Sequence, residues 1–563
     1  MKKNFLNFIL PVVLASCLIT SPASAVTIPG SAEPSRVQQQ IAPQEAPQMN
    51  APPIRGAEQP APAVAPQGAE KYSFTLRHVL VSGVTVYKSA DILPLFAAER
   101  GKAVTLAYVY GLAERLTAKY RNDGYILTQV VVPPQTIKNG IVHLRAVEGF
   151  VDKVSIQDAG GGDAFLYKMA APVTSERPLN MKTLARVLLL MNDLPGVSAR
   201  AVLSAAPKTQ GASDVTILVS HKRADVSLEA DNRGTRYLGP LQMNATAQVN
   251  APTGHFDSIA LQVARTPDNA EMTYAGVTYT VPLGASGAQL SLGGNSGRDL
   301  PGYSLGTFDI NGLSQGLFAQ VSYPFIRERW KNLSALLRFD YLDSTYTENL
   351  VSFTTADRLS VLRLGATWQS ADRFSGLSTL TAQASRGLGL FNPTTPGTPN
   401  MSRVDGRSDF TKVTAQASRL QRVTDKVQLY AAVSGQKSAD ILLASEEFGI
   451  GGAAFGSAYD PSEITGEDGV AGRIELRYSA AAGKPGMKTC QPYIFYDIGK
   501  VWDPDSTAAS DRIASLADAG AGVRATFTDT LSGSFEAALP LTRTVAATHN
   551  RHARAFFSLA AKF

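Results

Sequence analysis

The chain has very little cysteine: Cys17 and Cys490 are the two in 563 residues. Cys17 lies in an apolar leader, so the mature chain would retain Cys490 alone and no internal disulfide could form. Histidine is also scarce, at six residues. The one close pair, His549 and His552, lies in a polar turn before the last predicted strand, where solvated surface is a better interpretation than a metal site. Stability must therefore come from packing and hydrogen bonding.

Long apolar runs are absent after residue 26, so no membrane-spanning helix is expected there. The formal charge of +6 includes no basic stripe with interleaved aromatic residues, so nucleic acid is not an expected partner. The glycine-rich stretch from Phe448 to Gly469 lacks the lysine and the following helix that a phosphate-binding loop needs. Since no Ser/His/Asp-type set is found either, we predict no enzyme, no metal and no cofactor.

Residues 1–25 have the pattern of an export signal peptide, with two lysines, an apolar core from Phe5 to Ile19 and an Ala-x-Ala end at Ala25. The alternative is a lipoprotein signal, because residues 14–17 also fit such a signal. Cleavage before Cys17 would then make a lipidated Cys17 the mature N-terminus. Cleavage after Ala25 fits better, since the apolar run continues beyond Cys17.

Residues 26–70 are dominated by Pro, Ala, Gln and Glu and have almost no large apolar residues to bury. This composition predicts a disordered, partly extended linker. Residues 35–40 could form a short helical piece, whose length the flanking prolines limit.

After the linker the pattern changes to strands and helices. Residues 71–149 predict a strand, two helices and two further strands, with apolar residues at helical spacing in the second helix and Gly124 at its end. The same order, β-α-α-β-β, returns in residues 150–223. A repeated unit of this size indicates two small tandem α+β domains.

In residues 224–563 helices are not expected, and apolar and polar residues alternate strictly, as in residues 473–478. Alternation fits either a soluble sandwich or an outer-membrane barrel with one face toward lipid and the other toward a wet lumen. Many polar-face residues are Arg, Glu or Asp, which a dry sandwich core could not hold. The fold class is therefore predicted as mainly β, with a transmembrane antiparallel β-barrel of about 16 strands, an even count being expected.

Residues 116–149 contain a Tyr-Arg-x-x-Gly-Tyr turn, a Pro-Pro-Gln segment and a closing Val-Glu-Gly149. This stretch resembles the first POTRA domain of the transporter (TpsB-type) component of two-partner secretion, the hemolysin-activation and hemagglutinin-secretion family within the Omp85 superfamily. Further support comes from ADNRGTRYLGPLQ, VSYPFIRERWKNL and FYDIGKVW in the barrel region. The resemblance implies two POTRA-like domains, a barrel, and a pore that moves a large unfolded protein from the periplasm to the cell surface without ATP.

By this resemblance, the first POTRA-like domain would capture the exported protein by adding one of its strands to an exposed sheet edge. Tyr120 and Val147 are expected in the domain core. Each candidate surface residue could equally serve to build the domain and its turn. The substrate-binding surface is predicted at Tyr125, Leu127, Val131, Pro133, Pro134 and Gln135.

Residues 446–472 are similar to the family's loop that folds back into the barrel lumen. The family's Arg-Gly-Tyr/Phe tip reads Ser457, Ala458 and Tyr459 here. A carboxylate inside a partly wet barrel without a cation costs about 1–3 kcal/mol unless another group replaces it. The missing tip arginine therefore puts the loop conformation and full transport competence in question.

In relatives the tip arginine is expected to meet the aspartate of an F-x-D-x-G strand. Phe495, Asp497 and Gly499 match that strand. Asp497 is thus expected to lose its usual partner, unless Arg473 or Arg477 serves instead.

The implied partners are a large secreted exoprotein of the adhesin or hemolysin type, outer-membrane lipid, and the barrel-assembly machinery, which would read the terminal strand ending in Phe563. The implied location is the outer membrane of a Gram-negative bacterium, with the POTRA-like domains in the periplasm. Two alternatives stay open: an Omp85-type assembly or insertion factor that folds client barrels at its seam, and a passive porin or an enzyme housed in the barrel. Two POTRA-like units behind a Pro-rich linker favour secretion, whereas three or more would favour assembly.

Overall fold

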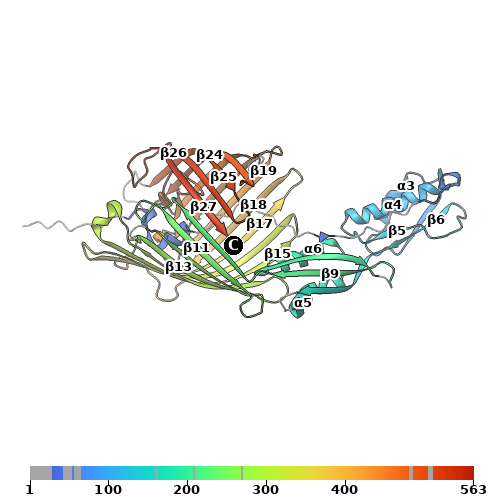
Figure 1. Cartoon of the computed structure of the whole chain (residues 1–563), viewed down its shortest axis with the longest axis horizontal. Helices are drawn as coiled ribbons and strands as arrows, with labels where there is room; N and C mark the ends of the chain where they lie inside the picture. The colour runs from blue at the N-terminus through green and yellow to red at the C-terminus, as the bar shows by residue number, and fades with distance from the viewer. Residues whose placement is uncertain are drawn as a thin grey trace, which may run out of the picture.

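The computed structural model describes residues 28–41, 54–55, 65–158, 163–206, 209–267, 270–480, 486–504 and 512–563. The predicted signal and most of the predicted linker lie outside these residues. Figure 1 shows two small α+β domains in a row beside a large β-barrel, with a short blue N-terminal segment at the barrel. Within the described residues, no helix is long and apolar enough to cross a membrane.

The first α+β domain packs a three-stranded sheet against the long helix α4 (Leu106–Asn122). Thr105 caps this helix by accepting a hydrogen bond from Tyr108 N at 3.3 Å. Every third or fourth residue of α4 faces the sheet, and Tyr120 at its end is fully buried. The sheet order is β3 (His78–Ser82), β6 (Ile141–Val147), β5 (Gln129–Val131); the other elements are β2 (Ser73–Thr75), α2 (Ser89–Ile92), α3 (Pro94–Ala97) and β4 (Ala103–Thr105), with η3 (Ala69–Lys71) before them.

The second α+β domain has the predicted element order β-α-α-β-β, whereas the first also contains the short strands β2 and β4 and divides its first helical region into α2 and α3. A linker strand, β1 (Ile54–Arg55), pairs in parallel with Ala201 and Val202 of β8 and so covers the outer edge of its sheet. Asn180 caps α6 by accepting from Lys182 N at 3.0 Å. The elements are β7 (Phe150–Asp158), α5 (Asp163–Ser175), α6 (Met181–Asn192), β8 (Val197–Ala205) and β9 (Ala212–His221), with the sheet order β1-β8-β9-β7.

Two glycines of the family-like motif lie at the junction between these domains. Gly124, with φ of +99°, accepts a hydrogen bond from Met181 N at 3.0 Å. Gly149 accepts from Leu179 N at 3.0 Å, and a Cβ on it would overlap Leu127. A Cβ on Gly124 would lie 2.6 Å from Asn180 Oδ1, so glycine there lets the second domain approach closely, whereas glycine at 149 leaves room for Leu127 of the first domain.

The second domain is docked on turns at one end of the barrel. Arg327 at the end of β15 pairs with Asp193 at 2.5 Å. Phe256, from the turn between β11 and β12, is 3% exposed because it is inserted into the core of the second domain, where it stacks on Phe165 with ring centroids 5.3 Å apart. These contacts fix which end of the barrel faces the α+β domains.

Sixteen antiparallel strands close the barrel, and β10 pairs with β27. This confirms the predicted fold class. The barrel strands are β10 (Ala224–Asp231), β11 (Gln242–Asn250), β12 (Ser258–Arg265), β13 (Met272–Pro282), β14 (Gln289–Asp299), β15 (Ile310–Arg327), β16 (Lys331–Glu348), β17 (Phe353–Ala371), β18 (Gly376–Gly387), β19 (Thr411–Arg422), β20 (Val427–Ser438), β23 (Asp468–Tyr478), β24 (Thr489–Trp502), β25 (Ile513–Thr526), β26 (Leu531–Pro540) and β27 (Arg554–Lys562).

The two faces of the barrel wall differ as the alternation predicts. On β23, Ile474 and Leu476 are 48% and 45% exposed on the outer face. Arg473 and Glu475 alternate with them and are 8% and 1% exposed toward the lumen. The wall is therefore apolar outside and ionic inside.

The N-terminal lumen segment, residues 28–41, consists of η1 (Gly30–Ala32), η2 (Pro34–Arg36) and α1 (Val37–Gln40). Composition predicts these residues as linker, but the structure packs them on the inner wall, where η2 neighbours β14, β15 and β16. The reason is that their few apolar side chains find partners there: Ala32 packs near Tyr237, and Val37 and Ile41 pack near Met272.

Candidate functional site

The predicted lumen loop, residues 446–472, folds inward as a hairpin after β20, but it ends earlier than predicted because β23 begins at Asp468. Its strands β21 (Phe448–Ile450) and β22 (Ile464–Gly466) pair antiparallel. On the facing wall, a Cβ on Gly499 would lie 2.7 Å from Ile450 Cδ1. The glycine of the predicted F-x-D-x-G strand therefore clears the space that the hairpin occupies.

Asp497 binds the loop tip through backbone amides. Gly456 N and Ser457 N each donate to Asp497 Oδ2 at 3.1 Å. Arg473 Nη1 lies 3.2 Å from the same oxygen and also donates to Ser457 Oγ at 2.8 Å. Its guanidinium stacks over the Phe495 ring at 4.3 Å. Of the two arginines considered as replacements for the missing tip cation, Arg473 therefore serves, and the barrel wall supplies the charge that the loop lacks.

Arg477, the other candidate, does not reach the tip. It pairs with Glu475 at 2.6 Å and stacks over Tyr430 at 4.6 Å. Sequence could not separate the two arginines, because both lie on the lumen face of one strand. Only the strand register, which pairs Arg473 with Asp497, decides between them.

The rest of the tip is held by the last strands. Arg554 on β27 donates to Ala458 O at 3.0 Å and pairs with Asp460 at 2.6 Å. Tyr459, 1% exposed, has its hydroxyl 3.2 Å from both Ala517 O and Arg543 O. The predicted tip residues therefore lie together, buried between the loop and the wall.

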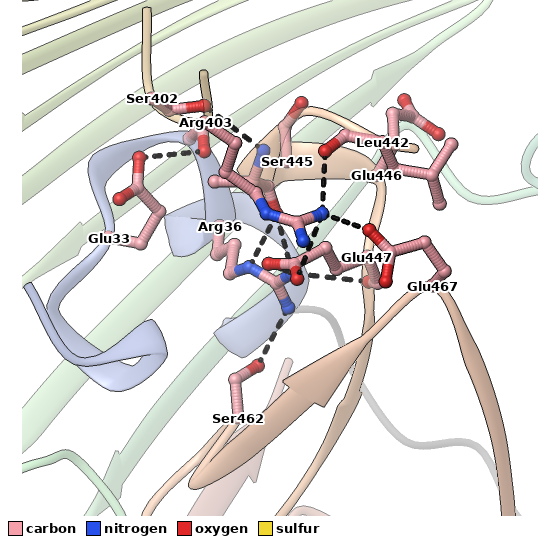
Figure 2. A network of polar contacts seen from close by, with 12 residues as sticks. Glu33, Arg36, Ser402, Arg403, Leu442, Ser445, Glu446, Glu447, Ser462 and Glu467 are labelled. Atoms are coloured by element: carbon pink, nitrogen blue, oxygen red, sulfur yellow. Dashed lines mark hydrogen bonds and ion pairs between the residues drawn. The ribbon is translucent and has the colours of Figure 1, made fainter. Parts of the chain in front are cut away.

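The base of the loop meets the N-terminal lumen segment in a buried ionic network (Figure 2). Arg36, 1% exposed, donates to Ala444 O at 2.9 Å and to Ser462 Oγ at 3.3 Å. It also lies 3.5 Å from Glu447 Oε2. One arginine therefore ties the segment to the residues just before β21 and to those just before β22.

A second arginine extends this network to the end of β24. Arg403 lies 3.4 Å from Glu447, bonds Glu467, and pairs with Asp503 at 2.7 Å. Removing one partner from such a buried ion pair leaves an uncompensated charge and is strongly destabilising. The closed arrangement is therefore held by charges that satisfy one another.

Glu446 is held by two cations from the wall. Arg363 Nη2 and Lys412 Nζ lie 2.7 Å and 2.8 Å from its carboxylate. Arg36, Arg403 and the role of Glu446 were not predicted, since Arg36 stands isolated in a Pro/Ala/Gln-rich stretch and the other two lie in loops without a recognisable pattern. The one available signal was the apolar Val37 beside Arg36.

In the first α+β domain, β5 is an edge strand of the described sheet. A groove of about 430 Å³ lies between this edge and α4, lined in part by Gly111, Glu114 and Gln129. Inside it, Val130 N donates outward to Thr117 Oγ1 of α4 at 3.0 Å. The outward backbone donor of the edge is therefore occupied by one side-chain hydroxyl.

The predicted binding residues have different surroundings, and Val131 is the one that belongs to the edge strand β5. Pro133 is half-buried and Pro134 is exposed. Tyr125 packs edge-on against Tyr120 at 6.2 Å, and Leu127 packs on the core of the second domain. Gln135 bonds His143 through both its donor, at 2.7 Å, and its acceptor, at 2.8 Å. A binding role for these six residues stays a prediction.

Glu148 explains the Val-Glu-Gly motif. Its carboxylate accepts from Tyr120 OH at 2.7 Å, from Thr85 N at 2.8 Å and from Val86 N at 3.3 Å. Burial would raise the pKa of Glu148, but these hydrogen bonds, with that of the Thr85 hydroxyl, outweigh it and hold the pKa below its usual range. The carboxylate therefore ties α4 to the segment after β3.

Phe563 lies at the barrel seam, just beyond β27, and is 61% exposed. Its amide donates to Val226 O at 2.8 Å, and its carbonyl accepts from Val226 N at 3.2 Å and from Lys222 Nζ at 2.9 Å. The predicted terminal residue is thus paired to the first barrel strand. Among the described residues, no group of three or more His, Cys, Asp or Glu side chains suits a metal ion.

Known protein families match both parts of the chain. Residues 211–525 match the family described as haemolysin secretion/activation protein ShlB/FhaC/HecB. Residues 74–149 match the POTRA domain, ShlB-type. The two matches together cover the first α+β domain and most of the barrel.

Individual relatives are distant but cover most of the chain. The heme/hemopexin transporter protein HuxB of Haemophilus influenzae (strain 86-028NP) is 22% identical, over 77% of each chain. The outer membrane transporter CdiB of Dickeya dadantii (strain 3937) is 23% identical, over 75% of each chain.

Solved structures show the same fold. CdiB from Escherichia coli superposes with a TM-score of 0.70 and 22% identity, over 90% of this chain and 94% of that one. BamA from Haemophilus ducreyi lacking POTRA domains 1-3 superposes with a TM-score of 0.52 and 13% identity, over 87% and 100%.

Proposed function

The chain belongs to the haemolysin secretion/activation protein family ShlB/FhaC/HecB, a family of transporters, and from this premise we propose that it exports one large exoprotein in an unfolded state without ATP. Its barrel lies in the outer membrane and its POTRA-like domains lie in the periplasm. The observation that carries the proposal is the barrel lumen with its ionic lining. The lumen loop and the N-terminal lumen segment occupy it, and both are held there by noncovalent contacts.

Capture takes place on the first POTRA-like domain. The edge of β5 and the groove of about 430 Å³ beside it offer a place for an extended strand of the exoprotein. The corresponding outer edge of the second domain is covered by β1 of the linker. The uncovered edge of the first domain supports this domain as the primary docking site.

Passage requires the lumen loop and the N-terminal lumen segment to leave their positions. Arg36 joins both elements in one network, so they should leave the lumen together. The exoprotein then moves outward because the part that has emerged folds at the cell surface. Folded chain cannot return through the pore, so the equilibrium between inward and outward movement shifts outward. No nucleotide is needed for this direction.

The exoprotein is expected to be of the adhesin or hemolysin type. The description of the family as haemolysin secretion/activation proteins supports this class of cargo, and the names of HuxB and CdiB support a transport function. Outer-membrane lipid contacts the apolar wall, and the barrel-assembly machinery inserts the chain by reading its terminal strand at Phe563.

The test is deletion of this chain followed by measurement of the exported protein in the medium. We expect release to stop and to return when the intact chain is restored. Unchanged release would reject the export function. An Omp85-type assembly factor would instead show a general loss of outer-membrane barrels upon deletion.

A further inference from the structure

The seam between the first and last barrel strands is short. Five residue pairs join β10 to β27, whereas eight join β10 to β11. The first residues of β27, from Arg554 to Phe557, extend beyond the last of these five pairs. Because β10 starts directly after the periplasmic domains, this unpaired stretch lies on the extracellular side. Unpaired backbone groups at a strand edge need other partners.

Asn232, the residue after β10, supplies those partners with its side chain. Its Nδ2 donates to Ala555 O at 3.0 Å, and its Oδ1 accepts from Phe557 N at 2.7 Å. Its own amide donates to Phe557 O at 3.3 Å. A carboxamide carries the same donor and acceptor as a peptide group, so Asn232 continues the ladder where the backbone has turned away.

Arg233, the next residue, reaches across β27 to the following strand. Its guanidinium lies over the Phe556 ring at 4.8 Å and pairs with Glu536 of β26 at 3.0 Å. Glu536 is buried and also accepts from Tyr493 OH at 2.7 Å. The chain on the β10 side is thus fastened to two strands on the other side of the seam.

The same carboxylate connects the seam to the loop tip. Arg473, which holds Ser457, lies 3.7 Å from Glu536 Oε2. On β27, Arg554 binds Ala458 and Asp460 of the loop. Contacts that hold the lumen loop therefore lie on the β27 side of the seam, while Asn232 and Arg233 hold that side to β10.

We propose that Asn232 and Arg233 form a clasp that keeps the extracellular half of the seam closed, so that the barrel wall stays intact while the lumen opens. The clasp uses the Asn-Arg pair of the ADNRGTRYLGPLQ stretch. It makes the seam a fixed part of the wall rather than a lateral exit. This inference deepens the proposed export function, but its first test needs no exoprotein.

The first test is amide hydrogen exchange at Phe557 in the full chain in detergent micelles. Asn232→Ala should raise the exchange rate of this amide about tenfold, since its acceptor is removed, while amides of the β19–β20 ladder stay unchanged. Asn244→Ala, on the lumen face of neighbouring β11, is the matched control and should leave Phe557 protected. Unchanged exchange at Phe557 in folded Asn232→Ala would overturn the clasp.

If Asn232→Ala fails to insert, Asn232→Asp replaces it, because the carboxylate keeps the acceptor for Phe557 but loses the donor to Ala555. Exchange across residues 554–557 should then rise about threefold, and no rise would overturn the proposal. Arg233→Met should add to this loosening, since it removes the bridge to Glu536; no added effect would also count against the clasp.

The second test joins the seam covalently. Val226 and Phe563 exchange both backbone hydrogen bonds, so Glu229 and Ala560, three residues along the ladder, are a non-hydrogen-bonded pair with close Cβ atoms. Glu229→Cys with Ala560→Cys, in a Cys490→Ser background, can therefore form a disulfide. Export should continue at the same rate with the disulfide formed or reduced. Export that stops only when it is formed would overturn the fixed seam, whereas unchanged release after deletion of the whole chain would instead reject the proposed function.

Discussion

Arg473 and Asp497 lie directly opposite each other on neighbouring barrel strands and form an ion pair at 3.2 Å. Both residues belong to the wall, so the pair persists when the lumen loop moves. The loop itself contributes neutral groups to this site, the amides of Gly456 and Ser457 and the hydroxyl of Ser457. Release of the tip from this site therefore leaves no buried charge without a partner.

Arg473→Gln is expected to loosen the loop tip and to destabilise the barrel. It leaves the buried carboxylates of Asp497 and Glu536 with one cation fewer, and the loss of one partner of a buried pair costs about 3–5 kcal/mol. Single-channel conductance should show frequent openings. Arg477→Gln is the control, since Arg477 pairs with Glu475 but does not contact the tip. A trace like that of the unchanged chain would show that Arg473 does not hold the loop.

The effect of losing Arg473 should be compensated by an arginine placed on the loop tip instead. Ser457→Arg alone places a second cation beside Arg473. Because Ser457 is only 1% exposed, the added charge would be buried, and channel openings should become more frequent. Combined with Arg473→Ser, Ser457→Arg returns one arginine to the site from the loop side. We expect the double variant to be quieter than either single variant, and additive effects in the conductance trace would contradict a shared site.

Arg36→Met should free the N-terminal lumen segment and the loop together. It removes the contacts to Ala444, Ser462 and Glu447 while keeping the length of the side chain. We expect conductance to rise and protease cleavage within residues 28–41 to become faster. Gln40→Ala, which loses a contact to Ser31 inside the segment, is the control. If the segment is cleaved faster while the loop tip keeps its amide protection, the two elements are not coupled.

Thr117→Ala should strengthen exoprotein binding. Alanine removes the hydroxyl that occupies Val130 N and puts no methyl in its place, so the edge donor of β5 becomes free for an added strand. One such hydrogen bond is worth about 0.5–1.5 kcal/mol, or roughly three- to tenfold in affinity. Calorimetry with an N-terminal fragment of the exoprotein checks this, and weaker binding would place the docked strand elsewhere.

Glu148 should make the first domain sensitive to acid. Its pKa is lower in the folded state than the usual value of about 4.3. The stabilisation is therefore fully present above that usual pKa and is lost as the pH falls below it toward the lowered folded pKa. Exchange at Thr85 and Val86, corrected for its intrinsic pH dependence, should accelerate in this window. In Glu148→Gln the acceleration should disappear, and an identical profile would assign it to another group.

The barrel could be predicted from sequence because the alternation of polar and apolar residues is visible in a few consecutive positions. In Arg473, Ile474 and Glu475 it already indicates which face of the strand is polar. The capping threonine, Thr105, and the helical spacing of Leu112 and Leu116 are local in the same way. The α+β repeat and the closed wall follow from such patterns.

The site could be predicted only in part, because its contacts join residues far apart in the chain. The pairing of Arg473 with Asp497 depends on strand register, and the contact of Arg36 with Ala444 depends on where a linker-like segment enters the lumen. Neither quantity is encoded in a short window. The resemblance located the tip at Ser457, but the origin of its cation required the folded wall.

The most direct test of export through the lumen is to lock the N-terminal lumen segment in place. A Cβ built on Gly297 lies 3.8 Å from Val37 Cβ, which is the mean Cβ separation of a disulfide. Val37→Cys with Gly297→Cys, in a Cys490→Ser background, should therefore cross-link. The account predicts that release of the exoprotein into the medium stops when this disulfide forms and returns on reduction. Release that continues with the segment locked would contradict passage through the lumen.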